Sequence, residues 1–173
     1  MEMSILYALQ KIHTPMLDKA MVFVSLLGNS GMIWIIIGLL MLCFKNYRKC
    51  GVAVLFALIF CLIFGNGLIK NLVARPRPCW IDTSVMLLIP TPTDFSFPSG
   101  HTFSSFTAAI CIFFYHKKEG SLALALAILI AFSRLYLFVH FPTDILGGIV
   151  LGTIAACAGI YFSMQLSKHK PVI

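Results

Sequence analysis

The feature that most constrains this chain is a charge-free apolar run that begins after Lys19 and continues for 25 residues, 20–44. A helix that crosses the hydrocarbon core of a bilayer needs about 20 such residues, because each residue rises about 1.5 Å. The apolar part of a signal peptide has only about 7–15 residues, so we expect a retained span. Because 60% of the residues are hydrophobic and only 11% are charged, the chain is expected to lie in a membrane.

Four further apolar segments follow, which makes five predicted spans. The third is short unless its helix begins near Ser99, and the fourth contains Arg134. These two could be short buried or re-entrant helices, but polar residues are also expected where span ends line a site. We predict an all-α integral membrane protein, a bundle of five transmembrane helices that forms a single domain over residues 1–173. The predicted spans are residues 20–44, 50–69, 102–115, 120–139 and 145–167.

Residues 1–18 are predicted to form an amphipathic helix in the plane of the membrane interface. Apolar residues recur there at near-helical spacing among polar and charged ones, a pattern typical of interfacial helices. Thr14 and Pro15 are expected to bend this helix before the first span. The alternative is a frayed terminus.

Basic residues outside the motifs predict the orientation of the chain. They gather in the first-to-second connection, the third-to-fourth connection and the C-terminal tail, which five spans place on one side. The positive-inside rule makes that side cytoplasmic. We expect a multi-pass protein of the cell membrane, of bacterial inner or plasma membrane type, with a cytoplasmic C-terminus and its polar stretches on the extracytoplasmic face. These loops and an anion site account for the formal charge of +7, so no nucleic-acid partner is expected.

Neither a disulfide framework nor a metal site is predicted. Five of the six cysteines lie in or at the ends of predicted spans, and only Cys79 lies on the outer side. The chain has no CxxC or other metal-ligand spacing. Few outer carboxylates remain for a two-metal site, so no cofactor is expected. Besides Asp144, these are Glu2, Asp18, Asp82 and Asp94.

The first of three polar stretches lies at the outer end of the second span and carries Lys70, Arg75 and Arg77. Pro76 and Pro78 favour extended backbone around Arg77, which lets its guanidinium turn back toward the bundle. Arginine offers a planar fork for two phosphate oxygens and lysine a point charge, so phosphate is a natural ligand. The alternative is contact with lipid headgroups, which we expect of Arg75.

A connection of 28 residues, 71–98, follows and contains five prolines. Structureless loops rarely exceed about 12–15 residues, and longer ones often act as lids or binding elements. We expect this loop to contact the substrate. Trp80 within it is expected to anchor the membrane interface.

The second polar stretch, Pro98-Ser99-Gly100-His101, is typical of the start of a helix with Ser99 as its N-cap. Gly100 permits close backbone approach, and the free N–H groups and dipole of a helix start favour an anion. His101 would lie in the first turn, beside any bound anion. A lone histidine near a membrane interface is usually a hydrogen-bonded bystander, and its place beside the helix start is what favours a functional role.

The third polar stretch contains Arg134, which is costly inside a span unless it is paired or functional. If Pro142 opens the last helix, His140 and Asp144 lie four residues apart at its beginning. The carboxylate could then hold one imidazole nitrogen and leave the other as an oriented nucleophile or base. An isolated pair of this kind can also be structural.

Together these residues resemble the three-part signature of the type 2 phosphatidic acid phosphatase family, which also includes soluble vanadium haloperoxidases. The resemblance covers residues 70–144, here called the signature region, and leaves residues 1–60 without a motif. Members of this family commonly have six spans, whereas we expect five and an interfacial helix. The matching motifs are Lys70-x6-Arg77-Pro78, Pro98-Ser99-Gly100-His101 and Ser133-Arg134-x5-His140-x3-Asp144.

The resemblance implies how phosphate is bound. Lys70, Arg77 and Arg134 would hold its oxygens. Ser99 and the backbone N–H of Gly100 would complete the site.

The resemblance also implies a mechanism, in which His140, oriented by Asp144, attacks phosphorus and forms a phosphohistidine. His101 would protonate the leaving oxygen and then activate water. Phosphoryl transfer depends mainly on positioning and charge stabilisation, which basic side chains supply here, so a metal-independent reaction is expected.

The expected partners are membrane lipids and a lipid phosphate or diphosphate substrate, and no obligate protein partner is evident. Undecaprenyl diphosphate or phosphatidylglycerol phosphate is favoured over phosphatidic acid or a lipid A phosphate. A haloperoxidase would need a soluble scaffold, which the hydropathy excludes. The alternatives are a catalytically inactive lipid-phosphate-binding protein and a small anion transporter, which would need polar residues throughout the membrane.

Overall fold

The computed structural model describes residues 1–168, with Asn66 described by its backbone alone. Every regular element in these residues is helical, in agreement with the predicted all-α class. Short 3-10 turns, Asn29–Gly31 and Lys45–Tyr47, and a π-helical stretch, Cys61–Ile69, connect some of the helices. The α-helices are α1 (Glu2–Gln10), α2 (Pro15–Leu27), α3 (Met32–Cys43), α4 (Arg48–Phe60), α5 (Lys70–Val73), α6 (Pro78–Ile81), α7 (Gly100–Tyr115), α8 (Lys117–Tyr136) and α9 (Pro142–Lys168).

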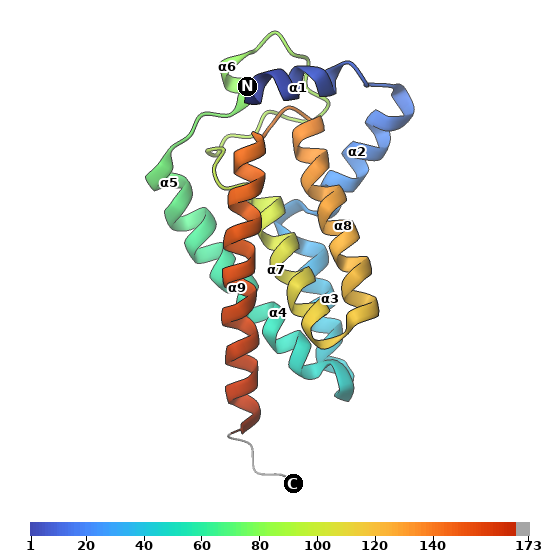
Figure 1. Cartoon of the computed structure of the whole chain (residues 1–173), viewed down its shortest axis with the longest axis vertical. Helices are drawn as coiled ribbons and strands as arrows, with labels where there is room; N and C mark the ends of the chain where they lie inside the picture. The colour runs from blue at the N-terminus through green and yellow to red at the C-terminus, as the bar shows by residue number, and fades with distance from the viewer. Residues whose placement is uncertain (169–173) are drawn as a thin grey trace.

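The bundle is organised around α7, which packs against α4, α8 and α9 (Figure 1). Small residues let the helices approach closely. A Cβ added at Gly159 of α9 would lie 2.4 Å from the carbonyl oxygen of Ala53, and one at Gly152 would lie 3.1 Å from that of Phe103. Close backbone packing of this kind is how helices associate in lipid, where apolar surface alone gives little driving force. It holds α9 directly against α4 and α7.

Three helical stretches are long and apolar enough to cross a membrane, and a fourth is added if α2 and the helix after it form one bent span. The remaining predicted span, the third in chain order at residues 102–115, corresponds to α7, which has 16 residues and begins at Gly100 after the N-cap Ser99. The structure therefore agrees with a helical membrane bundle, while the number of five spans stays a prediction. The three long stretches are Lys45–Ile81, Lys117–Tyr136 and Pro142–Lys168.

The first predicted span, residues 20–44, is broken by a bend and is not one continuous helix. α2 ends at Leu27, and the chain bends by 43° before it continues in α3. Ser30 and Gly31 in the break have φ values of 53° and 65°. An L-residue with a side chain rarely adopts this left-handed backbone, so the conformation of Ser30 is imposed by its surroundings rather than by its own preference.

The N-terminal helix is shorter than predicted. α1 ends at Gln10 and lies across one end of the bundle, which fits an interfacial helix (Figure 1). Thr14 caps α2 by accepting a hydrogen bond from the backbone N–H of Leu17, and Pro15 is the first residue of α2. Thr14 and Pro15 therefore begin a new helix, because proline suits a first turn in which its missing N–H is not needed.

All three polar stretches meet at one end of the bundle. α1, the loop around α6 and the short connection between α8 and α9 lie at that end, and the α3–α4 and α7–α8 connections lie at the other (Figure 1). The last turn of α9 also lies at the far end. The basic tail used in the orientation argument includes Lys170, which lies outside the described residues.

Candidate active site

A partly open cavity of about 920 Å³ lies beneath the 71–98 loop. Six of the eight predicted site residues line it. The remaining two, Ser99 and Asp144, are fully buried and do not line it. Much of the remaining wall is apolar and includes Leu26 of α2, Ile35 of α3 and Leu58 of α4. The six predicted residues are Lys70, Arg77, Gly100, His101, Arg134 and His140.

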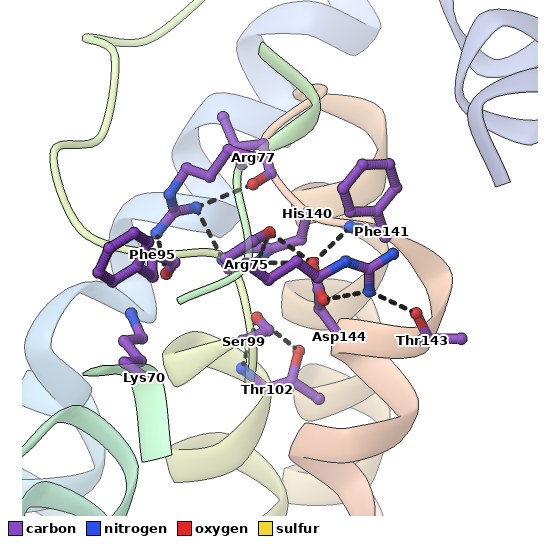
Figure 2. A network of polar contacts seen from close by, with 12 residues as sticks. Lys70, Arg75, Arg77, Phe95, Ser99, Thr102, His140, Phe141, Thr143 and Asp144 are labelled. Carbon is purple, nitrogen blue, oxygen red and sulfur yellow. Dashed lines mark hydrogen bonds and ion pairs between the residues drawn. The ribbon is translucent and has the colours of Figure 1, made fainter. Parts of the chain in front are cut away.

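Arg77 turns back into the bundle, as the flanking prolines predict, and only 2% of its surface is exposed (Figure 2). Its backbone is extended, with φ −82° and ψ 155°. The guanidinium donates from Nε to the carbonyl oxygen of Asp94 at 2.7 Å and from NH1 to that of Val139 at 2.8 Å. Arg77 therefore joins the 71–98 loop to the α8–α9 connection.

Asp94 is a site residue that sequence reasoning missed. In the sequence it is only one of a few outer carboxylates without a motif. Its side chain pairs with Lys70 through one oxygen and with Arg77 NH2 at 2.6 Å through the other. Partial burial opposes ionisation, but Lys70 and Arg77 outweigh it and lower the pKa of Asp94 to about 2. Asp94 is thus an anion held by two of the three predicted phosphate-binding cations.

His140 lies at the centre of this polar network. Its Nε2 is 3.0 Å from Arg77 NH1. Arginine keeps its protons, so NH1 donates and Nε2 is the unprotonated nitrogen. Nδ1 then carries the proton and faces Ser96 Oγ at 3.4 Å and Asp144 Oδ2 at 3.5 Å. Burial, followed by the charges of Arg77 and Arg134, holds the pKa of His140 well below its ordinary value, so the imidazole is neutral.

Asp144 stands in the first turn of α9, which Pro142 opens as predicted. Its Oδ2 accepts hydrogen bonds from Ser96 Oγ at 2.5 Å and from the backbone N–H of Phe141 at 2.8 Å. The fully buried carboxylate is therefore held rigidly beside His140. Ser96 contacts both members of the pair, and sequence reasoning missed it, because its only signal was proximity to the second polar stretch.

The prediction that Arg75 contacts lipid headgroups was wrong. Its guanidinium donates to Asp144 Oδ1 at 2.7 Å and to Thr143 Oγ1 at 2.6 Å (Figure 2). It also donates to the carboxylate of Glu2 at 2.6 Å. The cause is the left-handed residue Ala74, with φ 45°, which ends α5 and redirects the chain. Arg75 therefore fixes the carboxylate of Asp144 from the side opposite His140.

Trp80, which is predicted to anchor the membrane interface, makes two contacts within the 71–98 loop. Its indole Nε1 donates to the carbonyl oxygen of Pro92 at 3.0 Å, and its ring contacts Phe95 edge-on with centroids 6.1 Å apart. Trp80 therefore holds together the two halves of the 71–98 loop, which carries Asp94 into the site.

The helix start at α7 forms as predicted. Ser99 Oγ accepts hydrogen bonds from the N–H and the hydroxyl of Thr102, at 3.5 and 3.1 Å. His101 lies in the first turn, and its Nε2 is 2.9 Å from Asn29 Oδ1. Asn29 belongs to the break between α2 and α3, and sequence reasoning missed it, because it lies in a part of the chain without a motif.

Arg134, on the last turn of α8, is 4% exposed and bonds to Ser25 of α2. Among the side chains that the structure describes, its Nε is the one buried nitrogen or oxygen without a hydrogen-bond partner. A buried donor left unpaired is costly, and this one belongs to a residue that lines the cavity. The position is suited to an acceptor oxygen that enters the cavity.

Fold and site define a helical membrane protein with a basic, histidine-containing cavity at one end of its bundle. The model of the PAP2 superfamily matches residues 50–168, more than half of the chain. The chain belongs to the PAP2 superfamily, so the family predicted from its three polar stretches is confirmed.

Known relatives agree with this assignment. An undecaprenyl-diphosphatase of Sulfolobus acidocaldarius is 32% identical over 157 residues, which cover 90% of this chain and 73% of that protein. A transmembrane PAP2-type phosphatidylglycerolphosphate phosphatase of Bacillus subtilis has a similar crystal structure, with TM-score 0.75, 26% identity and coverage of 96% of this chain and 86% of that one. The crystal structure of LpxE of Aquifex aeolicus shares the fold, with TM-score 0.75, 24% identity and coverage of 92% and 94%.

Proposed function

We propose that this protein is an integral-membrane phosphatase that hydrolyses a lipid phosphate or diphosphate. One observation carries the proposal: a single cavity has cationic and histidine side chains in one part of its wall and apolar side chains from α2, α3 and α4 in another. A phosphate headgroup suits the first part and a lipid chain suits the second. The activities named for the relatives support this assignment.

The cationic side chains bind the phosphate. Lys70, Arg77 and Arg134 all line the cavity and supply N–H donors for its oxygens. The unpaired Nε of Arg134 takes one oxygen, and the backbone N–H of Gly100 at the start of α7 takes another. Ser99 does not line the cavity but caps that helix, which holds its first backbone N–H groups in place.

His140 is the nucleophile. Its Nε2 lone pair becomes available when Arg77 donates to the phosphate instead of to Nε2. The lone pair then attacks phosphorus, and the bond from phosphorus to the leaving oxygen breaks, which gives a phosphohistidine. Asp144 and Ser96 keep the proton on Nδ1 and stabilise the positive charge that develops on the ring.

His101 is the general acid and base. It donates a proton to the leaving oxygen in the first step. In the second step it takes a proton from a water that attacks phosphorus, and the phosphorus–nitrogen bond breaks to release inorganic phosphate and neutral His140.

Basic side chains take the place of a metal in this reaction. Among residues 1–168 no group of three or more His, Cys, Asp or Glu side chains is placed to hold an ion. Charge on the transferring phosphoryl group is stabilised by Lys70, Arg77 and Arg134.

A lipid diphosphate or phosphatidylglycerol phosphate is the favoured substrate, as the names of the two relatives above suggest. These substrates differ in their leaving group. The leaving group of a lipid diphosphate is a lipid phosphate, and that of phosphatidylglycerol phosphate is an alcohol. A phosphate leaving group needs protonation less than an alcohol does, so a His101→Ala variant should lose less activity on a diphosphate.

The site faces the extracytoplasmic side, because the basic α3–α4 and α7–α8 connections lie at the opposite end of the bundle. An epitope inserted after Ser84 should be accessible on intact cells, and one inserted after Asn46 should not. The reverse pattern would overturn this orientation.

The activity is tested with purified protein in detergent and a panel of lipid phosphates and diphosphates. We expect phosphate release in the presence of EDTA and its loss in His140→Ala. His116→Ala, which changes a histidine at the far end of the bundle, is the matched control and should keep full activity. Binding without turnover would favour an inactive lipid-binding protein, and dependence on added magnesium would overturn the metal-independent mechanism.

A further inference from the structure

The residues before the family match also contribute to the site. The superfamily model begins at residue 50, yet Asn29 in the break between α2 and α3 contacts a predicted catalytic residue. We propose that Asn29 is a positioning residue, which holds His101 so that Nδ1 is its proton-transferring atom. This inference rests on the proposed phosphatase function and assigns a role to a part of the chain that carries no motif.

Hydrogen-bond chemistry identifies the protonation state of the His101 nitrogen that bonds to Asn29. Asn29 Oδ1 is a carbonyl oxygen and can only accept, so His101 Nε2, at 2.9 Å, carries a proton that it donates to Asn29. Nδ1 is then the nitrogen that gains and loses a proton. The amide oxygen also stabilises the imidazolium form, which the acid step requires.

A second contact fixes the orientation of the ring. A Cβ added at Gly28 would lie 2.8 Å from Cδ2 and 3.5 Å from Cγ of His101, so this edge of the ring packs on the glycine backbone. Nδ1 lies on the ring edge that faces away from Gly28. Packing on one edge and a hydrogen bond at Nε2 therefore leave Nδ1 available to the cavity that His101 lines.

The break between α2 and α3 explains how Asn29 reaches this position. In place of a continuous helix, Ser30 and Gly31 adopt positive φ. The side chain of Asn29, beside these two residues, bonds to His101. The unfavourable backbone conformation of Ser30 therefore lies next to a residue that contacts the site, as is common for strained residues near functional groups.

The test compares Asn29→Leu with the wild type on a lipid monophosphate and on p-nitrophenyl phosphate, whose leaving group needs no protonation. We expect kcat/KM, which reports the step that releases the leaving group, to fall about 10–100-fold on the lipid and less than about threefold on p-nitrophenyl phosphate. Asn29→Asp keeps an acceptor oxygen and should recover most of the lost activity. Asn46→Leu makes the same change at an exposed asparagine of the far end and should match the wild type.

A double-mutant cycle separates positioning from damage to the fold. If Asn29 acts through His101, Asn29→Leu should cause no further loss in a His101→Ala background. An equal loss of kcat/KM on both substrates, or additive losses in the cycle, would overturn the inference. Thermal unfolding of each purified variant identifies any that fails to fold, in which case Gly28→Ala, which displaces the ring of His101, takes its place with the same expected results.

The outcomes also distinguish this inference from the proposed function. An inactive wild-type protein would overturn both. An active wild type with an equally active Asn29→Leu variant would overturn only the role of Asn29.

Discussion

Arg75 donates a hydrogen bond at 2.7 Å to Asp144 Oδ1, the carboxylate oxygen that does not face His140. Asp144 is fully buried, so Arg75 is its charged partner on that side, while Ser96 and the Phe141 N–H hold the other oxygen. The same guanidinium binds Glu2 of α1. One side chain thus couples the N-terminal helix to the orientation of the pair proposed for catalysis.

We expect Arg75→Gln to lower both activity and stability. Loss of a charged donor from a buried carboxylate lowers the free energy of unfolding by about 1–3 kcal/mol. Each ~1.4 kcal/mol of lost transition-state stabilisation lowers kcat about tenfold. The measurements are phosphate release and thermal unfolding in detergent. Arg48→Gln at the far end, where the arginine donates to the carbonyl oxygen of Leu42, should change neither. Normal kcat in Arg75→Gln would show that Asp144 is positioned without Arg75.

Asp94→Asn should strengthen inhibition by inorganic phosphate or vanadate. The carboxylate of Asp94 occupies N–H donors of Lys70 and Arg77 that a phosphate would use, so its charge competes with the ligand. We expect the inhibition constant to fall about tenfold, which is ~1.4 kcal/mol. Asp82→Asn, in the same loop but bonded to Tyr7 and Ser84, is the control. Weaker inhibition in Asp94→Asn would mean that Asp94 mainly orients Arg77.

The stability contributed by Asp94 should disappear in acid. Its pKa is about 2 in the folded protein, against an ordinary value of 3.8. A carboxyl with a lowered pKa contributes stability that is present above its unfolded pKa and is lost as pH falls through the folded pKa. The difference in Tm between wild type and Asp94→Asn should therefore be constant from about pH 5 to 7 and shrink between about pH 4 and 2. Because the Asp94 side chain is 54% exposed, the difference in Tm should be small. A difference in Tm that increases in acid would contradict the ion pairs.

Gly159→Ala should destabilise the bundle without touching the site. The added Cβ would lie 2.4 Å from the carbonyl oxygen of Ala53, so α4 and α9 would have to separate. Overpacking of this kind costs about 1–3 kcal/mol, which thermal unfolding can detect. At Gly67 an added Cβ would meet nothing closer than 3.8 Å, so Gly67→Ala is a matched control. Equal Tm values for the two variants would contradict the tight contact between α4 and α9.

Site features that depend on local chain geometry could be predicted. Ser99 is an N-cap, and Pro142 places His140 and Asp144 near the start of one helix, because both follow from short-range backbone rules. Asp94 and Asn29 could not be predicted in the same way. Each reaches the site only after a loop or a helix break has taken a path that the packing of other helices decides.

By itself, the sequence determined that the chain is a helical membrane protein, that it belongs to a phosphatase superfamily, and that its polar stretches meet at one end of the bundle. Apolar run length and fixed motif spacing are enough for this, since both are local properties. Only the tertiary structure decided that the first span is broken, that Arg75 turns to Asp144, and that Asn29 meets His101. These contacts join residues 69–72 positions apart, and their geometry depends on backbone conformations at Ala74 and Ser30 that local preference disfavours.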